Sequence, residues 1–346
     1  MSAGGVFISF AICLIIAIPI SISLGIVAVL PGAFDASFTA SAGYVIRSMV
    51  GGIDSFPLLA VPMFVLAGIL MAHGKISEKL FDVFVYFLGN KRAGIPCAVI
   101  ITCLFYGAIS GSAPATVAAV GSMTIPLLIE LGYEKDFSTA IVAVAGGLGV
   151  IIPPSIPFIM YAMATGESVS DLFLAGIVPG MMISALLIFY AYYYCRRHGE
   201  DREKIQAKMD QLKTKGFVNI LKESIWALLS PVIVLGCIYS VVASPTEAAV
   251  ISVFYSLFVS LFIYKSIKVK QIWGIMVEAM KTYAPILFIL ATSTAFSRVL
   301  TLMQVPQDVS AWIMTHFSNE IVLLLVINVV LLIVGMVMDT TPAILI

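Results

Sequence analysis

Several long stretches of this chain contain no aspartate, glutamate, lysine or arginine, and all of them are strongly apolar. A bilayer core requires about 20 apolar residues per helix, and a lipid-embedded backbone must satisfy its own hydrogen bonds. Runs this long are helices rather than barrel strands, so the predicted fold class is an all-α polytopic membrane protein. The mean hydropathy of +1.09 excludes a pair of soluble domains. The stretches are 1–34, 93–129, 137–166, 172–195, 224–246, 248–264, 282–297 and 321–338.

The opening stretch, 1–34, has no basic residues at its start and is too long for a secretory signal. We therefore expect it to form a first transmembrane helix. The side of the membrane on which it starts stays open, because charge alone does not count the crossings before residue 54.

Basic residues are concentrated in one hydrophilic segment, 196–223, which holds eight of the nineteen lysines and arginines. The positive-inside rule makes this segment a cytoplasmic linker. The turn between 137–166 and 172–195 holds Glu167 and Asp171 but no basic residue, so we expect it outside. Nineteen acidic residues cancel the basic ones, and the net charge gives no reason to expect nucleic acid as a partner.

Two other classes of membrane protein fit the chain poorly. It has no phosphate-binding GxxxxGK[ST] loop, which excludes an ATP-driven pump for this chain alone. An intramembrane hydrolase is a remote alternative, because the sequence at 107–111 is GxxSG and no histidine lies in the middle of a span to act as a base. We therefore expect a transport protein and not an enzyme.

The uncharged stretch 93–129 is interrupted at its centre by the sequence Ser-Gly-Ser-Ala-Pro, residues 110–114, where a helix must break. The flanking halves have 15 to 17 residues. Each is about 25 Å long as a helix, which is short for a ~30 Å core. We predict a re-entrant helical hairpin with its tip inside the protein.

A weak internal repeat links this hairpin to the C-terminal part of the chain. An offset of 228 residues pairs Gly107 with Gly335 and Pro114 with Pro342, which predicts a second hairpin over 321–346. An odd number of crossings between the hairpins implies an inverted-topology repeat, although two ordinary helical hairpins remain an alternative. The domains expected are a first repeat (1–195), the linker (196–223) and a second repeat (224–346) that is incomplete within this sequence. The crossings counted between the two hairpins are five, an odd number: 137–166, 172–195, 224–243, 245–264 and 282–300.

The stretch 137–166 contains three glycines and three prolines near its centre and cannot be one continuous helix. Unwound backbone at this depth lies within protein or lines a wet cavity. Its carbonyls, with the hydroxyls of Ser110, Ser112 and Thr116, would supply neutral oxygen ligands to a hard cation. The N-termini of half-helices would attract an anion.

Sodium is the favoured cation, because 93–129 and 137–166 contain no carboxylate or histidine to carry a proton. Asp339, the one acid at the second break, could be a cation ligand, a protonation site or a helix cap. Glu247 follows a helix-start sequence, and both a capping role and a functional role are open for it.

Five sequence blocks occur in order along the chain, at 54–64, 107–113, 151–157, 245–249 and 339–346. Together they resemble the large membrane (permease) subunit of tripartite ATP-independent periplasmic (TRAP) transporters, of the ion transporter superfamily. The resemblance covers essentially the whole chain. It implies an elevator-type, sodium-coupled importer of an organic acid, such as a C4-dicarboxylate or sialic acid, in the bacterial cytoplasmic (inner) membrane. The implied partners are a small four-helix membrane subunit and a soluble periplasmic substrate-binding protein. A related symporter that needs no binding protein is the alternative.

The candidate site residues form two sets. Those expected to bind Na⁺ are Ser110, Gly111, Ser112, Gly147, Gly149, Asp339, Thr340 and Thr341, and those expected to line the substrate site are Ser112, Thr116, Pro153, Pro154 and Ser155.

This sequence departs from the family pattern at two points. The family usually has serine and threonine where this chain has Ala145, Gly146 and Gly147, and often an acid where it has Thr116. We therefore expect backbone oxygens to carry more of the ligation. By the repeat, the partner of 151–157 would fall at about 379–385, so a complete second cation site is not expected within these residues.

Overall fold

The computed structural model describes residues 2–35, 38–214, 216–240, 242–316, 319–337 and 340–345. Within these ranges the regular elements are helices, with no strand. Among the described residues, six helices are long and apolar enough to cross a membrane, which confirms the prediction of an all-α, multi-pass membrane protein. They are Phe56–His73, Ala113–Glu130, Val169–His198, Phe217–Tyr239, Pro245–Ile263 and Val269–Leu302.

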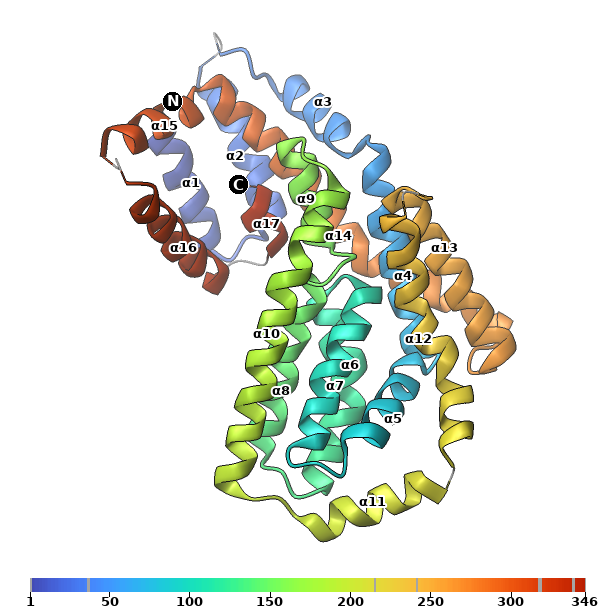
Figure 1. Cartoon of the computed structure of the whole chain (residues 1–346). Helices are drawn as coiled ribbons and strands as arrows, with labels where there is room; N and C mark the ends of the chain where they lie inside the picture. The colour runs from blue at the N-terminus through green and yellow to red at the C-terminus, as the bar shows by residue number, and fades with distance from the viewer. Residues whose placement is uncertain are drawn as a thin grey trace. The chain divides into compact units, whose positions relative to one another are not determined.

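The chain divides into two compact units (Figure 1). Unit 1 comprises Met1–Leu58 and Thr282–Ile346, and unit 2 comprises Leu59–Lys281. The long helix α14, Val269–Leu302, begins in the sequence of unit 2 and ends in that of unit 1. The predicted division at 195 and 224 follows sequence repeats and the hydrophilic segment, whereas the units are defined by packing.

The prediction of one helix over the first apolar run is wrong. The run forms two shorter helices, α1 (Ala3–Ile15) and α2 (Ile20–Phe34), which pack against each other. Ala17 between them has a left-handed φ of 63°. Pro19 follows and has no N–H to continue a helix, so the chain turns there.

Part of the apolar core of unit 1 is a cluster of buried side chains from α1, α2 and α14. Val6 and Phe10 of α1 and Leu24 and Val27 of α2 pack with Phe296 of α14. The rings of Phe10 and Phe296 stack with centroids 6.0 Å apart. The remaining helices of this unit are α3 (Ala42–Ile53), α15 (Val305–His316), α16 (Glu320–Val337) and α17 (Thr340–Leu345).

Unit 2 is built around α6 (Gly94–Ser110), which packs against helices on several sides. Figure 1 shows α6 beside α7 and near α8 and α10. Apolar residues of α6, among them Ile95, Val99 and Ile109, lie in the largest core cluster of the described chain. The helices that contact α6 are α4 (Ala60–His73), α5 (Ile76–Leu88), α7 (Ala113–Glu130), α8 (Lys135–Gly146), α10 (Val169–His198) and α12 (Phe217–Tyr239).

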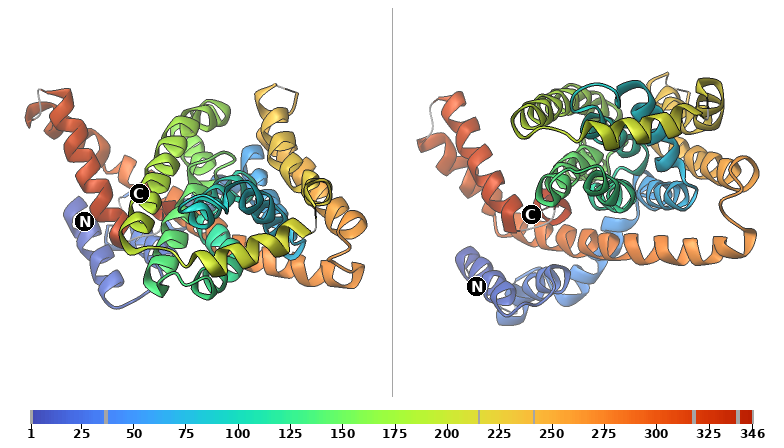
Figure 2. Two further views of the ribbon diagram at one scale, coloured as in Figure 1. Left: turned by 60° about the horizontal axis from the view of Figure 1, so that its bottom comes forward. Right: turned by 90° about the horizontal axis from the view of Figure 1, so that it is seen from below.

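The hydrophilic segment expected to be a linker contains helical structure. It contains α11 (Arg202–Thr214), and α12 already begins at Phe217. Ile205, Met209 and Leu212 are buried on one side of α11, which packs on α5. Their spacing of four and three residues places them on one helical face. Figure 2 shows α11 running across one end of unit 2.

The helix after α12 begins with Glu247 in a capping position. α13 (Pro245–Phe258) begins with a capping box, and it continues as a π-helical turn, Val259–Ile263. The Glu247 carboxylate accepts hydrogen bonds from the Ser244 N–H at 2.7 Å and from the Ser244 hydroxyl at 2.8 Å. Of the two roles considered for Glu247, the structure has the helix cap.

Candidate functional site at the hairpin tip

The first hairpin turns over two residues. α6 ends at Ser110, Gly111 adopts a left-handed φ of 62°, and Ser112 is extended before α7 begins at Ala113. A left-handed residue after a helix end favours glycine, and Pro114 suits the first turn of α7 because no N–H is needed there. The helix break therefore falls within 110–114, as the sequence predicts.

The predicted break within 137–166 is also present. α8 ends at Gly146, a 3₁₀ turn covers Gly147–Val150, and α9 (Ile156–Thr165) begins after a non-helical stretch. The bond between Pro153 and Pro154 is cis. Ser155 closes the break, because its hydroxyl donates to the Val150 carbonyl at 2.6 Å and accepts from the Phe158 N–H at 3.3 Å.

The hairpin tip and the break are in direct backbone contact. The N–H of Ile156 donates to the Gly111 carbonyl at 3.2 Å. A Cβ added to Gly107 would lie 2.6 Å from the Gly149 Cα, and one added to Gly111 would lie 2.8 Å from the Pro154 carbonyl oxygen. Side chains at these glycines would force the two segments apart.

A cluster of neutral oxygens lies at this contact. The hydroxyls of Ser110 and Thr116 are 2.9 Å apart, and Thr116 donates to the Ser112 carbonyl at 2.8 Å. Ser110 and Thr116 are buried, and Ser112 is half-buried. A Cβ on Gly149 would meet the Thr116 hydroxyl. The predicted residues Ser110, Gly111, Ser112, Thr116, Gly149 and Pro154 thus lie together.

Four helix ends meet at the tip and the break. α6 and the 3₁₀ turn end there, and α7 and α9 begin there. Helix C-termini carry partial negative charge on their carbonyls, and helix N-termini carry partial positive charge on their N–H groups. The arrangement can offer oxygens to a small cation and N–H groups to an anion without a charged side chain.

The other predicted residues have different surroundings. Gly147 is half-buried, and a Cβ there would meet no atom within 4 Å, so the close contact does not require a glycine at this position. Pro153 and Ser155 are buried in the break. Thr340 and Thr341 begin α17 in unit 1. Asp339 lies outside the described residues.

The sequence did not identify the residues through which the tip and the break contact the neighbouring helices α4 and α10. The Tyr106 hydroxyl donates to the Gly68 carbonyl of α4 at 2.9 Å. Gly176 and Gly180 of α10 lie against the break, where a Cβ on Gly176 would be 2.5 Å from the Ile151 carbonyl oxygen. Their Gly-x-x-x-Gly spacing, typical of closely packed membrane helices, was a usable signal, whereas nothing in the sequence distinguished Gly68 or Tyr106.

Comparison with known proteins agrees with this architecture. Residues 7–346 match the family model described as the tripartite ATP-independent periplasmic transporter, DctM component. The isethionate TRAP transporter permease protein DctMQ of Oleidesulfovibrio alaskensis is 40% identical over 337 residues, which cover 97% of this chain and 52% of that protein.

The names of two further relatives mention other substrates. The C4-dicarboxylate TRAP transporter large permease protein of Pseudomonas aeruginosa is 38% identical, with 85% of this chain and 67% of that protein covered. The 2,3-diketo-L-gulonate TRAP transporter large permease protein of Escherichia coli is 36% identical, with 87% and 69% covered. The chain spans about half the length of the first relative and about two thirds of the other two. The chain therefore belongs to the DctM component family of tripartite ATP-independent periplasmic transporters.

Proposed function

We propose that the chain is the transport subunit of a sodium-coupled, binding-protein-dependent importer of an organic acid. The observation that carries the proposal is the contact between the hairpin tip and the helix break, where the Ser110 and Thr116 hydroxyls lie 2.9 Å apart. Family membership favours transport over the alternative of an intramembrane hydrolase.

Sodium suits the chemistry of this site. Sodium is a hard cation that prefers oxygen ligands, and the tip and break supply hydroxyls and helix-end carbonyls. The stretches 93–129 and 137–166 contain no carboxylate or histidine that could carry a proton instead. In this proposal Ser110, Gly111, Ser112, Gly147 and Gly149 bind one sodium ion, and Asp339, Thr340 and Thr341 contribute to a second site.

The substrate in this proposal is an acid whose charge is held by the N-termini of α7 and α9. Ser112, Thr116, Pro153, Pro154 and Ser155 would line its site. The relatives named for isethionate, C4-dicarboxylates and 2,3-diketo-L-gulonate support an acidic substrate but differ in the acid. We propose a C4-dicarboxylate or a similar carboxylate.

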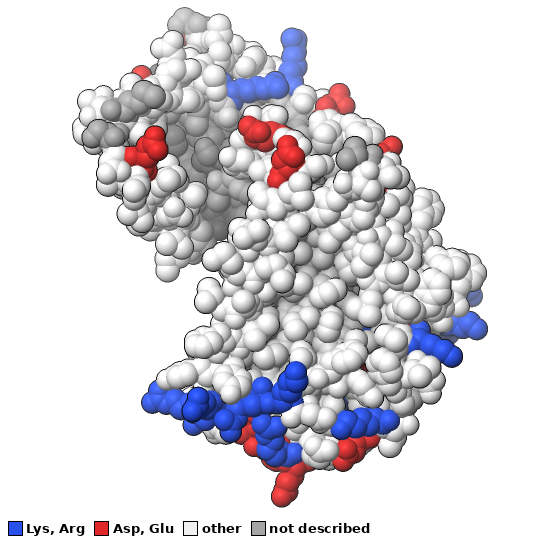
Figure 3. Space-filling view, viewed as in Figure 1, with Lys and Arg blue, Asp and Glu red and all other residues white. Residues whose placement is uncertain are grey.

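The proposed assembly lies in the bacterial inner membrane with a small four-helix membrane subunit and a periplasmic binding protein. Lysine and arginine side chains gather at the end of unit 2 that carries α11 (Figure 3), which supports a cytoplasmic location for that end. An elevator movement and an inverted repeat remain part of the proposal and rest on the offset of 228 residues and on the family.

The test is uptake by the complete complex in proteoliposomes. We expect uptake to require both an inward sodium gradient and the binding protein, and uptake that persists when choline replaces sodium would refute the sodium coupling. Ser110→Ala and Ser112→Ala should each raise the half-saturating sodium concentration. Ser122→Ala, an exposed position on α7, is the matched control and should leave it unchanged. Asp339→Asn tests the second site in the same assay.

A further inference from the structure

Glu200 carries a buried carboxylate at the opposite end of the hairpin from the candidate site. Its side chain is 2% exposed. One oxygen, Oε1, accepts hydrogen bonds from the Ala93 N–H at 3.0 Å and from the Tyr133 hydroxyl at 2.7 Å. The other oxygen, Oε2, accepts from Arg202 Nη2 at 3.1 Å. The carboxylate is thus held by three donors.

These donors come from three different segments. Ala93 precedes α6, and Tyr133 lies in the turn after α7, so Glu200 holds both legs of the hairpin at its base. Arg202 begins α11 and also donates from Nη1 to the Asn90 carbonyl at 3.3 Å. One side chain therefore connects the hairpin base to the segment that leads from α10 into α11.

The backbone around Glu200 is arranged to permit these contacts. Ala93 has a left-handed φ of 57°, which is uncommon for a residue other than glycine, and its N–H is the one that Glu200 accepts. Gly132, with φ of 91°, packs against Asp201, the residue that follows Glu200. A Cβ on Gly132 would lie 3.1 Å from the Asp201 Cβ. The entry and exit of the hairpin are therefore fitted to residues 200 and 201.

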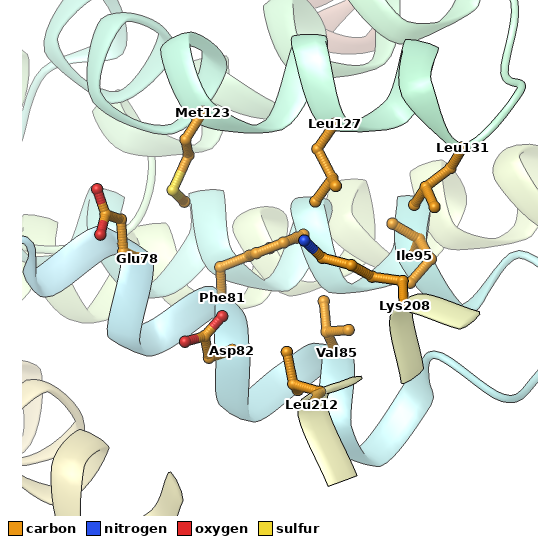
Figure 4. Close-up of a pocket in the computed structure, with 10 residues that line it drawn as sticks. All are labelled: Glu78, Phe81, Asp82, Val85, Ile95, Met123, Leu127, Leu131, Lys208 and Leu212. Carbon is orange, nitrogen blue, oxygen red and sulfur yellow. The ribbon is translucent and has the colours of Figure 1, made fainter. Parts of the chain in front are cut away.

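The side of the hairpin that faces α5 and α11 is packed around a small cavity. The cavity has a volume of about 150 Å³ and is lined by residues of α5, α6, α7 and α11. Figure 4 shows Leu127 and Leu131 of α7 facing it on one side and Phe81, Lys208 and Leu212 on the other. Close packing of α5 against α6 holds this side of the hairpin. The polar contacts of Glu200 add to that packing at the base.

The charge of Arg202 and the protonated hydroxyl of Tyr133 both stabilise the connection between Glu200 and the hairpin base. A buried carboxylate is costly unless it is paired and hydrogen-bonded, and Arg202 supplies the opposite charge. Burial and the hydrogen bond to Glu200 raise the pKa of Tyr133, so its hydroxyl stays protonated and continues to donate. Lys204 is engaged elsewhere, at 3.1 Å from Asp201.

We infer that Glu200 is a positioning residue for the candidate site: by holding both legs of the hairpin to the start of α11, it keeps the distant tip against the helix break. The tip lies one length of α6 away, about 25 Å at the helical rise. Binding sites require their groups within about 0.5 Å of the productive geometry. A hairpin released at its base would spend time with its tip displaced, and apparent affinity falls with the fraction of molecules that can bind.

The experiment compares Glu200→Ala, Tyr133→Phe and Glu200→Gln in the complete transporter complex in lipid nanodiscs and proteoliposomes. Glu203→Gln is the matched control, because it removes a negative charge from the exposed face of the same segment. Two quantities are measured: hydrogen exchange of the base (93–97 and 131–134) and of the tip (107–116), and the sodium dependence of uptake. The sodium measurement rests on the proposed function, whereas the exchange measurement does not.

Glu200→Ala and Tyr133→Phe should speed exchange at the tip as well as at the base. They should raise the half-saturating sodium concentration about three- to thirtyfold while the maximal rate at saturating sodium is kept. Glu200→Gln can keep an oxygen for Ala93 and Tyr133 but loses both the charge and the acceptor opposite Arg202. Because the bonds to the two legs of the hairpin are kept, its effect should be smaller than that of Glu200→Ala. A merely structural role would lower the amount of folded protein and the maximal rate without moving the half-saturating concentration.

Faster exchange at the base with an unchanged tip would overturn the inference and leave Glu200 as a local anchor. If Glu200→Ala does not fold, Tyr133→Phe decides, since it removes a single hydroxyl. If the unaltered complex takes up substrate without sodium, the proposed function fails, and tip exchange alone then supports or overturns the positioning role.

Discussion

The hydroxyl of Tyr106 in α6 donates a 2.9 Å hydrogen bond to the Gly68 carbonyl in the middle of α4. Tyr106 is 1% exposed. A Cβ on Gly68 would lie 3.2 Å from the Ser110 Cα, so α4 also lies directly behind the hairpin tip. The bond therefore fixes α4 to the hairpin about one helical turn before the candidate site.

Removing this hydroxyl should destabilise the protein. Tyr106→Phe removes the side-chain donor to the Gly68 carbonyl, which keeps its backbone partner within α4, and the loss of one such hydrogen bond costs about 0.5–1.5 kcal/mol. We expect a lower unfolding temperature of the purified complex in detergent. Tyr192→Phe on α10, where the tyrosine is 45% exposed, is the control. Equal unfolding temperatures for the two variants would contradict this account of the bond.

The close approach of Gly107 to Gly149 gives a second prediction. Gly107→Ala introduces a Cβ 2.6 Å from the Gly149 Cα, so the hairpin and the break must separate. Overpacking of this kind costs about 1–3 kcal/mol, which exceeds the gain of up to about 1 kcal/mol in helix propensity. We expect lower stability and a higher half-saturating sodium concentration for uptake.

Gly236→Ala is the matched control for Gly107→Ala. Gly236 also lies within a helix, α12, but a Cβ there would meet no atom within 4 Å. This variant should be as stable as the unaltered protein or slightly more stable. If both substitutions behave alike, the close approach has no energetic consequence.

Local sequence signals located the two breaks because glycine and proline act on the backbone where they stand. Gly111 and Pro114 predict the tip, and the glycines and prolines of 146–157 predict the interrupted helix. The same signal is present at Pro19, but the apolar run around it is uniform, so hydropathy predicts a single helix where the chain forms two. Hydropathy gives the length of an apolar run but does not show a turn within it.

Contacts between distant segments could not be read in this way. The bond from Tyr106 to Gly68 joins residues 38 positions apart, and that from Tyr133 to Glu200 joins residues 67 apart. In an apolar membrane chain every helix face is hydrophobic, so periodicity does not tell which face meets which. The amphipathic spacing of Ile205, Met209 and Leu212 in α11 was readable, but the basic residues around it favoured a linker.

The capping box of α13 gives a prediction that separates stability from transport. Ser244→Ala removes the hydroxyl that accepts from the Glu247 N–H at 3.3 Å, and the loss of a helix cap costs about 0.5–2 kcal/mol. We expect a lower unfolding temperature with an unchanged half-saturating sodium concentration. Ser168→Ala removes the N-cap of α10 and should behave in the same way. A change in sodium dependence confined to Ser244→Ala would show that this helix start acts in transport.

A pair of glycines at helix ends isolates the contact between the tip and the break. Gly111 and Gly166 both follow a helix in the left-handed conformation, with φ of 62° and 79°. Alanine at either position therefore bears a similar backbone cost, about 1–2 kcal/mol. Only at Gly111 does the added Cβ also approach the Pro154 carbonyl, at 2.8 Å, whereas Gly166 has no atom within 4 Å. Gly111→Ala should thus lose more stability than Gly166→Ala and should alone raise the half-saturating sodium concentration. If both variants have the same unfolding temperature and the same sodium dependence of uptake, the contact between Gly111 and Pro154 has no role in stability or sodium binding. The sodium site would then lie elsewhere.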